Sequence, residues 1–256
     1  METKKQLYDK TFFERNTIDA KLKSVDIVLN EVITIFPKCN SAVDFGCAMG
    51  TWLKGLEKYG ITDIRGYDGK WVDQSKLLIS PECFFEADFD KPIEIDRKFD
   101  LAISIEVGEH LHESSATSFI ENITKSADFV LFSAAIPFQG GENHVNEQWP
   151  EYWNEIFNRF GFVCIDCIRK RLWDNYDVVD FYRQNILLFV NKKRINEINV
   201  SQADICWDNP PMSLIPPDTY LKLVRYKKLF TPFSPLKTLV RKAFGVKIYN
   251  KIKDMI

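Results

Sequence analysis

Carboxylates and imidazoles crowd into one ten-residue segment, SIEVGEHLHE, at residues 104–113. The chain has three histidines, and two of them, His110 and His112, lie in this segment beside Glu106 and Glu109. The segment follows an apolar run that is typical of a buried strand. If the chain turns helical at Glu106, then Glu106, Glu109 and His110 share one face of the helix, whereas His112 points elsewhere and is expected at the surface. Carboxylates on one face repel each other unless a cation lies between them.

The third histidine, His144, follows the next apolar run. Ligands of open α/β sheets bind at the carboxyl ends of the strands, where both segments are expected to lie. Glu106, Glu109, His110 and His144 are therefore the predicted metal ligands, and this donor set suits Mg²⁺ or Mn²⁺. If no metal binds, His110 or His144 is the expected general base, because an imidazole titrates near neutral pH. Glu106 would then orient that base or a substrate hydroxyl.

The elements that must position these residues follow from the pattern of apolar residues. Strands that alternate with helices predict a mostly parallel sheet with helices on both faces. A helix is expected in IDAKLKSVDIVLNEVITIF, before Pro37, and another over residues 114–125. The last two predicted strands have no clear helix between them and are expected as an antiparallel pair at one edge. The segments expected to form strands are SAVDFGCAMG up to its glycine turn, DIRGYDG, CFFEADF, KFDLAISIE, DFVLFSAAIP, FVCIDCIRKRLW and RQNILLFVN.

A glycine-bearing turn follows the first predicted strand. Gly46 and Gly50 allow the backbone to approach a ligand closely and to present N–H groups at a helix N-terminus. Position 48 is alanine, so the spacing of a GxGxxG dinucleotide motif is not met. Acids end the next two predicted strands, Asp68 after the second and Asp88 after the third. Either acid alone is more simply explained as a helix cap or a turn residue.

The turn VDFGCAMG resembles the first motif of class I S-adenosylmethionine methyltransferases, usually written D-x-G-C-G-x-G, and Ala48 is a departure from that motif. The resemblance covers roughly residues 40–190. It implies the Rossmann-like fold of that family: a mostly parallel seven-stranded sheet with an antiparallel edge strand and helices on both faces. It also implies S-adenosylmethionine as cofactor, with Asp68 at the ribose and Asp88 and Phe89 at the adenine. The cofactor-binding residues expected from it are Asp44, Gly46, Cys47, Ala48, Gly50, Asp68, Asp88 and Phe89.

The pattern E-x-x-E-H followed by a later histidine resembles the metal site of two further groups of enzymes. These are the small-RNA 3′-terminal 2′-O-methyltransferases and the ubiquinone-pathway O-methyltransferases, in which the metal holds the acceptor hydroxyl beside the methyl donor. The block FSAAIPFQGGENHVNEQWPEYW, residues 132–153, resembles a bacterial methyltransferase group found among surface-polysaccharide genes, including those for O-methyl phosphoramidate capsule decorations. Asn146 and Gln148 in this block are expected to contact the substrate.

Charge and composition divide the chain into three parts. Residues 1–40 are expected as a helical segment that covers the cofactor site, 41–191 as the methyltransferase domain, and 192–256 as a proline-rich linker with basic amphipathic helices. Residues 222–256 hold ten Lys or Arg against one acid, whereas the whole chain has a net charge of −2. This basic tail is expected to pack on the acidic main domain, and a peripheral membrane contact is the second expectation. The sequence does not indicate an oligomeric state.

The composition also narrows the class of function. The N-terminal METKKQLYDK has no apolar core of a signal peptide, and the six scattered cysteines fit a reducing cytoplasm. The predicted function is a cytoplasmic S-adenosylmethionine-dependent O-methyltransferase, assisted by a divalent metal. Its expected substrate is a small-molecule or nucleotide-linked precursor of a capsule or surface glycan, methylated on a phosphoramidate or phosphate oxygen or on a sugar hydroxyl. The alternatives are a metal-independent O-methyltransferase with a histidine base and an RNA 2′-O-methyltransferase, although the near-neutral charge argues against nucleic acid.

Overall fold

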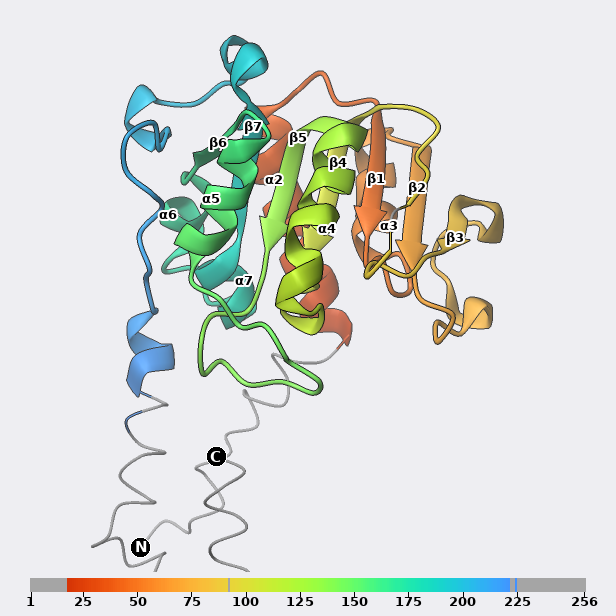
Figure 1. Cartoon of the computed structure of the whole chain (residues 1–256), viewed down its shortest axis with the longest axis horizontal. Helices are drawn as coiled ribbons and strands as arrows, with labels where there is room; N and C mark the ends of the chain where they lie inside the picture. The colour runs from red at the N-terminus through yellow and green to blue at the C-terminus, as the bar shows by residue number, and fades with distance from the viewer. Residues whose placement is uncertain (1–17, 92, 222–223, 225–256) are drawn as a thin grey trace, which may run out of the picture. The chain divides into compact units, whose positions relative to one another are not determined.

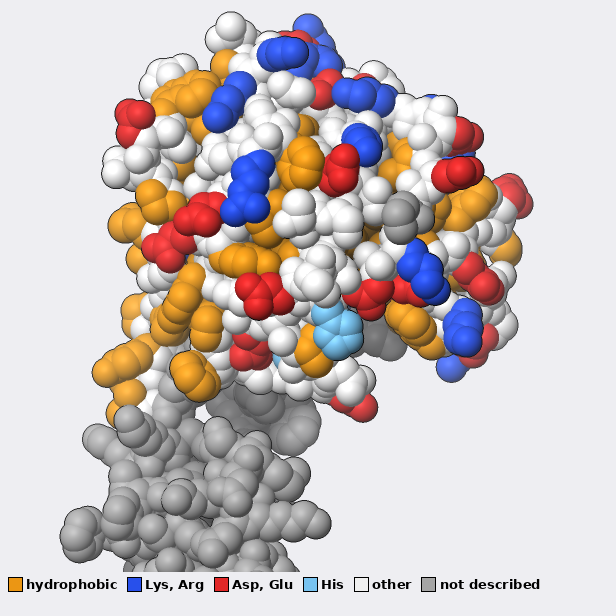
Figure 2. All heavy atoms as spheres, in the orientation of Figure 1, with side chains coloured by type: hydrophobic (Ala, Val, Ile, Leu, Met, Phe, Trp, Pro, Cys, Tyr) orange, Lys and Arg blue, Asp and Glu red, His pale blue; other side chains and the backbone are white. Residues whose placement is uncertain are grey.

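The computed structural model describes residues 18–91, 93–221 and 224. The chain divides into two compact units, Met1–Ser213 and Leu214–Ile256. Among the described residues, no helix combines the length and the apolar character that a bilayer crossing requires. Acidic and basic side chains are interspersed over the visible face of the described part (Figure 2). The predicted basic tail lies outside the described residues except for Val224, and so does the start of the predicted N-terminal segment, residues 1–17.

A seven-stranded sheet in the order β3-β2-β1-β4-β5-β7-β6 forms the centre of the first unit (Figure 1). Adjacent strands pair in parallel except at β7, which is antiparallel to both of its neighbours. The predicted fold is therefore confirmed, and its antiparallel strand lies one position in from the edge, between β5 and β6. The strands are β1 (Ser41–Phe45), β2 (Asp63–Asp68), β3 (Phe84–Glu86), β4 (Phe99–Ile105), β5 (Ala127–Ser133), β6 (Phe162–Ile165) and β7 (Leu187–Asn191).

Helices cover both faces of this sheet, as the alternating pattern predicts. Successive residues of β4 point to opposite faces, so that Leu101 and Ile103 pack in one apolar core and Ala102 in the other. The first core includes residues of α2, α3, α6 and α7, and the second includes residues of α4 and α5, which lie in front of the sheet in Figure 1. The helices are α2 (Ile18–Ile35), α3 (Thr51–Leu56), α4 (Glu113–Ser126), α5 (Pro150–Arg159), α6 (Ile168–Leu172) and α7 (Asp180–Asn185).

Short 3₁₀ turns lie between and after these helices and strands. They are η2 (Glu57–Tyr59), η3 (Gln74–Lys76), η4 (Pro81–Cys83), η5 (Gly108–His110), η6 (Lys192–Glu197) and η7 (Gln202–Asp204). The last of them lies beside β6, where Ile205 pairs with Ile165 and the Cys206 N–H donates to the Cys164 carbonyl at 2.9 Å. The chain after β7 therefore returns to the sheet at Ile205 and Cys206, and the first unit ends at Ser213.

The predicted strand FVCIDCIRKRLW is wrong in its second half. Strand β6 ends at Ile165, and α6 begins at Ile168. The Asp166 carboxylate accepts two hydrogen bonds from the Arg169 guanidinium, at 2.9 and 2.6 Å, and both side chains are buried. A pair three residues apart is compatible with a helical turn and not with an extended strand. The helices α6 and α7 thus lie between the last two strands, where none was expected.

Candidate functional site

The predicted glycine turn lies between β1 and α3, close to the segment that follows β4. Gly46 and Gly50 have left-handed φ angles of +87° and +81°, and Ala48 has +47°. The Gly46 N–H donates to the Tyr67 carbonyl of β2 at 2.8 Å. A Cβ atom on Gly46 would lie 2.3 Å from Val107 Cγ2, so the turn depends on glycine for both its conformation and its packing. The turn therefore lies at the point where the strand order reverses, between β1 and β4.

We expect Gly46→Ala to lower the free energy of unfolding by roughly 2–5 kcal/mol, because it adds a strained backbone to a steric overlap with Val107. Urea denaturation measures this loss. Gly60→Ala is the matched control: Gly60 has φ +78°, but no atom lies within 4 Å of an added Cβ. The control should show only the loss of stability that comes from backbone strain. Equal losses of free energy of unfolding in the two variants would contradict a destabilising overlap with Val107.

Two acids flank this turn. Asp68, at the end of β2, accepts hydrogen bonds from the backbone N–H of Ala48 at 2.7 Å and of Gly69 at 2.6 Å. Asp44, in β1, is buried, and its Oδ2 atom has no hydrogen-bond partner among the described residues. Burial, and next the Asp68 carboxylate, raise the pKa of Asp44 well above its usual value. The predicted residues Asp44, Ala48 and Asp68 are thus brought together around the turn.

Asp44→Asn is expected to make stability less dependent on pH. A carboxyl group whose pKa is raised by folding disfavours the folded state increasingly as pH rises above the ordinary aspartate pKa of 3.8. The free energy of unfolding of the variant should therefore rise relative to that of the wild type from acidic towards neutral pH. Urea denaturation over a pH series measures the two slopes. Asp208→Asn, at an exposed position, should keep the wild-type slope, and parallel curves for all three proteins would refute the expectation.

The remaining predicted cofactor residues occupy different surroundings. Asp88 is exposed and forms an ion pair with Lys91 at 2.6 Å. Phe89 is buried, with its ring 5.2 Å from that of Phe119 in the core under α4. Cys47 is also buried, against Gly66 of β2. Asp88 and Phe89 therefore do not share one surface, and their roles at the adenine remain predictions.

Trp71 is a candidate residue that the sequence interpretation missed. Its indole lies directly over Gly69, because a Cβ atom on Gly69 would be 2.2 Å from the ring. The side chain is 76% exposed although it is large and apolar. An aromatic residue three positions after the acid that ends β2 was the available sequence signal. Its ring lies against Gly69, the residue after Asp68, and is a candidate contact for a ligand bound at that acid.

The segment that follows β4 does not turn helical at Glu106, so the predicted common face is wrong. Glu106 has a left-handed φ of +56°, a 3₁₀ turn covers Gly108–His110, and α4 begins only at Glu113. The Glu106 N–H donates to the Ser133 carbonyl of β5 at 3.1 Å, which holds this conformation. Glu109 and His110 therefore belong to a short 3₁₀ turn that begins two residues after Glu106. His112 is exposed, as predicted.

Glu109 is a fully buried carboxylate, with 0% of its surface exposed. Neither of its carboxylate oxygens has a hydrogen-bond partner among the described residues. Burial, and next the Glu106 carboxylate, raise the pKa of Glu109 to about 9, and the nearby backbone N–H groups of Glu109 and Ala135 oppose this shift only partly. Buried charges in proteins are normally paired or coordinate a metal. This carboxylate thus lacks the partner that its burial requires.

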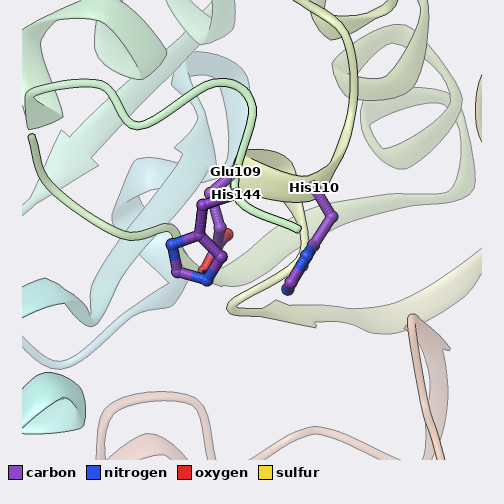
Figure 3. A group of neighbouring side chains, drawn as sticks. All are labelled: Glu109, His110 and His144. Carbon is purple, nitrogen blue, oxygen red and sulfur yellow. Dashed lines mark ion pairs between the residues drawn. The ribbon is translucent and has the colours of Figure 1, made fainter. Parts of the chain in front are cut away.

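Two imidazoles lie beside this carboxylate. Ligand atoms of Glu109, His110 and His144 all lie within 4.8 Å of one another (Figure 3). His144 Nε2 is 4.0 Å from Glu109 Oε1, and the two imidazole rings are 4.8 Å apart and nearly perpendicular. Burial, and next the His144 imidazole, lower the pKa of His110, which favours its neutral, ligating form. Three of the four predicted metal ligands are therefore brought together.

The fourth predicted ligand, Glu106, is held apart from this group. Its carboxylate accepts hydrogen bonds from Ser133 Oγ at 2.8 Å, Gln139 Nε2 at 2.8 Å and Asn185 Nδ2 at 3.0 Å. Burial raises the pKa of Glu106 above its usual value, and the hydrogen bonds from these three donors oppose this shift only partly. Gln184 also donates to Gln139 Oε1, at 3.2 Å. The sequence interpretation missed all four neighbours, and the polar pair before the apolar run ILLFV was the only signal for Gln184 and Asn185.

Both predicted substrate residues lie in the loop that carries His144. The Val145 and Asn146 N–H groups donate to the Glu109 carbonyl at 2.8 and 3.0 Å, which ties this loop to the turn after β4. Asn146 is buried, and its Oδ1 accepts a hydrogen bond from Gln148 Nε2 at 2.9 Å. The side chains of Asn146 and Gln148 thus contact each other, and their roles towards a substrate remain predictions.

Comparison with known proteins gave matches among solved structures alone. No family model matches the chain, and no curated protein matches it at a significant level. The structure of magnesium protoporphyrin IX methyltransferase from Synechocystis PCC 6803 with bound SAH is 15% identical, with a TM-score of 0.46 over 73% of this chain and 97% of that one. SAM-bound CalS10, an amino pentose methyltransferase from Micromonospora echinaspora, is 9% identical, with a TM-score of 0.49 over 75% and 99%. The methyltransferase domain of bacterial-CtHen1-CN is 19% identical, with a TM-score of 0.45 over 68% and 100%.

Proposed function

We propose that this protein is an S-adenosylmethionine-dependent O-methyltransferase that uses a divalent metal ion. The observation that carries the proposal is the Glu109 carboxylate, which is fully buried, has no hydrogen-bond partner among the described residues and lies within reach of two imidazoles. This group follows β4, next to the glycine turn after β1 and at the reversal of the strand order, where open α/β sheets bind their ligands. The motif at that turn supports S-adenosylmethionine as the ligand.

The donor set of Glu109, His110 and His144 fits Mg²⁺ or Mn²⁺, because it supplies a carboxylate without a partner and two imidazoles. Such an ion would lower the pKa of an acceptor hydroxyl or hold a phosphate or phosphoramidate oxygen. Asp68 would accept hydrogen bonds from the ribose hydroxyls of the cofactor. Glu106, held by three donors, would orient the acceptor.

In the proposed reaction, an acceptor oxygen attacks the methyl carbon of the sulfonium. The carbon–sulfur bond breaks as the oxygen–carbon bond forms, and S-adenosylhomocysteine leaves with the electron pair of the broken bond. With the metal bound, the proton of a hydroxyl acceptor would pass to solvent; if no metal binds, His110 or His144 is the candidate base. The methyl group is already activated in the sulfonium, so the main task of the protein is to align the two reactants.

The proposed acceptor is a small or nucleotide-linked precursor of a capsule or surface glycan, methylated in the cytoplasm on a phosphoramidate oxygen, a phosphate oxygen or a sugar hydroxyl. The resemblance of residues 132–153 to methyltransferases of surface-polysaccharide gene clusters supports this acceptor class. The same residues include His144 of the proposed metal site and the loop around it. The acceptor would therefore bind between this loop and the cofactor.

Formation of S-adenosylhomocysteine with candidate phosphoramidate, sugar-nucleotide and RNA acceptors tests the proposal. We expect turnover with a glycan precursor, its loss after thorough chelation and its return with Mg²⁺ or Mn²⁺. Unchanged activity after chelation would show that the reaction needs no metal, and a histidine would then be the base. Turnover of RNA and of no other acceptor would show that RNA, and not a glycan precursor, is the substrate. Failure to bind S-adenosylmethionine in calorimetry would contradict the whole proposal.

A further inference from the structure

The loop after β5 contains a carboxylate that is not one of the three candidate metal ligands Glu109, His110 and His144. Glu147 Oε2 accepts a hydrogen bond from the Phe138 N–H at 2.7 Å, and Oε1 accepts one from the Gly140 N–H at 2.7 Å. The Oε1 atom also lies 2.9 Å from His144 Nδ1. The side chain of Glu147 is 19% exposed and that of His144 12% exposed, so these contacts are largely shielded from water. Glu147 thus connects the backbone of the loop to one nitrogen of the His144 ring.

The chemistry of this contact determines where the proton of a neutral His144 lies. An ionised carboxylate only accepts hydrogen bonds, and the neutral imidazole has one N–H and one lone-pair nitrogen. A hydrogen bond to Glu147 therefore requires the proton on Nδ1, and the lone pair is then on Nε2. His144 Nε2 is the atom that lies 4.0 Å from Glu109 Oε1. The lone pair is thus on the nitrogen that belongs to the candidate metal site.

The backbone of the loop also holds Glu147 and the His144 ring in place. Phe138 and Gly140, whose N–H groups bind Glu147, both have left-handed φ angles, of +68° and +73°. A Cβ atom on Gly141 would lie 2.1 Å from His144 Nε2, so the imidazole lies against the backbone at a position where only glycine leaves room. Glu147 therefore holds an unusual loop conformation and the ring together.

We propose that Glu147 is a positioning residue that holds His144 in the Nδ1–H tautomer, with the Nε2 lone pair directed to a divalent ion shared with Glu109 and His110. The binding of the ion by Nε2 rests on the proposed metal-assisted function, whereas the Nδ1–H tautomer does not. A carboxylate that accepts the second N–H of a metal-binding histidine fixes the orientation of the ring and raises its basicity as a ligand. Glu147 would serve His144 in this way.

Nitrogen-15 NMR of the metal-free, full-length protein tests the tautomer directly, at a pH well above the usual histidine pKa of about 6.5. The chain has three histidines, so substitution of each in turn assigns every imidazole signal. We expect the His144 signals of the wild-type protein to report a proton on Nδ1, whereas the Nε2–H tautomer is the commoner one in water. A wild-type His144 with its proton on Nε2 would overturn the proposal without any variant being made.

Glu147→Met, which removes both carboxylate acceptors, extends the test, and Glu142→Met, at an exposed glutamate of the same loop, is the matched control. We expect Glu147→Met to shift His144 towards the Nε2–H tautomer and to weaken Mn²⁺ binding, followed by electron paramagnetic resonance, by about 10–100-fold. The control should change neither. An unchanged tautomer in Glu147→Met would overturn the proposal. A changed tautomer in a protein that binds no Mn²⁺ even as wild type would support the role of Glu147 and contradict the metal-assisted function.

Discussion

Glu109→Gln is expected to abolish the binding of Mg²⁺ or Mn²⁺ while the protein stays at least as stable as the wild type. The substitution keeps the shape of the side chain but removes the charge from the only carboxylate of the three-residue group found among the described residues. We expect Mn²⁺ affinity to fall more than about 100-fold, the upper range for loss of a residue that merely supports a ligand. Titration with Mn²⁺ and turnover with restored metal measure the two losses.

The stability of Glu109→Gln separates a ligand from a structural residue. The wild-type carboxyl is fully buried, and its pKa is raised to about 9 because burial disfavours the charged form. Glu109 therefore does not stabilise the metal-free fold at neutral pH. We expect the free energy of unfolding to stay the same or to rise, by up to about 3 kcal/mol at neutral pH. Glu113→Gln, at an exposed position at the start of α4, should leave metal binding unchanged. Unchanged Mn²⁺ affinity in Glu109→Gln would show that Glu109 is not a ligand.

Arg169→Met is expected to lower the free energy of unfolding by about 3–5 kcal/mol, because it leaves Asp166 as a buried and unpaired charge. Arg169 is 1% exposed and donates to both oxygens of the Asp166 carboxylate. It also donates to the carbonyls of Gln184 at 3.3 Å and Met212 at 2.9 Å. A loss of this size corresponds to a fall in Tm of about 10 °C for a chain of this length. Urea and thermal denaturation measure it.

A neighbouring ion pair supplies the control for Arg169. Lys170 pairs with Asp204 at 2.8 Å, but 49% of its side chain is exposed. Lys170→Met should therefore lose less than about 1 kcal/mol. The double variant Asp166→Asn, Arg169→Met should regain part of the loss, because it removes the unpaired charge. If Arg169→Met loses no more free energy of unfolding than Lys170→Met, burial does not strengthen the pair of Arg169 and Asp166.

Periodicity along the chain was enough to predict the sheet, the glycine turn and the helix α4. These features depend on contacts within a few residues: alternate residues of β4 face opposite sides, and helix α4 occupies Glu113–Ser126 against a prediction of 114–125. The proximity of His144 to Glu109 was also predictable, because both follow neighbouring parallel strands, β4 and β5. Local pattern and the geometry of parallel strands therefore determined the fold and most of the candidate site.

The tertiary structure alone decided where Glu106 points and how the last strands are arranged. The donors that hold Glu106 are 27, 33 and 79 residues away, and no periodicity indicates that Ser133, Gln139 and Asn185 meet one carboxylate. The partly buried Glu106 carboxylate is stabilised by these donors, and it reaches them from a left-handed backbone rather than a helical one. The pair of Asp166 and Arg169 likewise favoured α6 over a continued strand. Contacts between distant residues, which satisfy buried charges, override the local pattern at these positions.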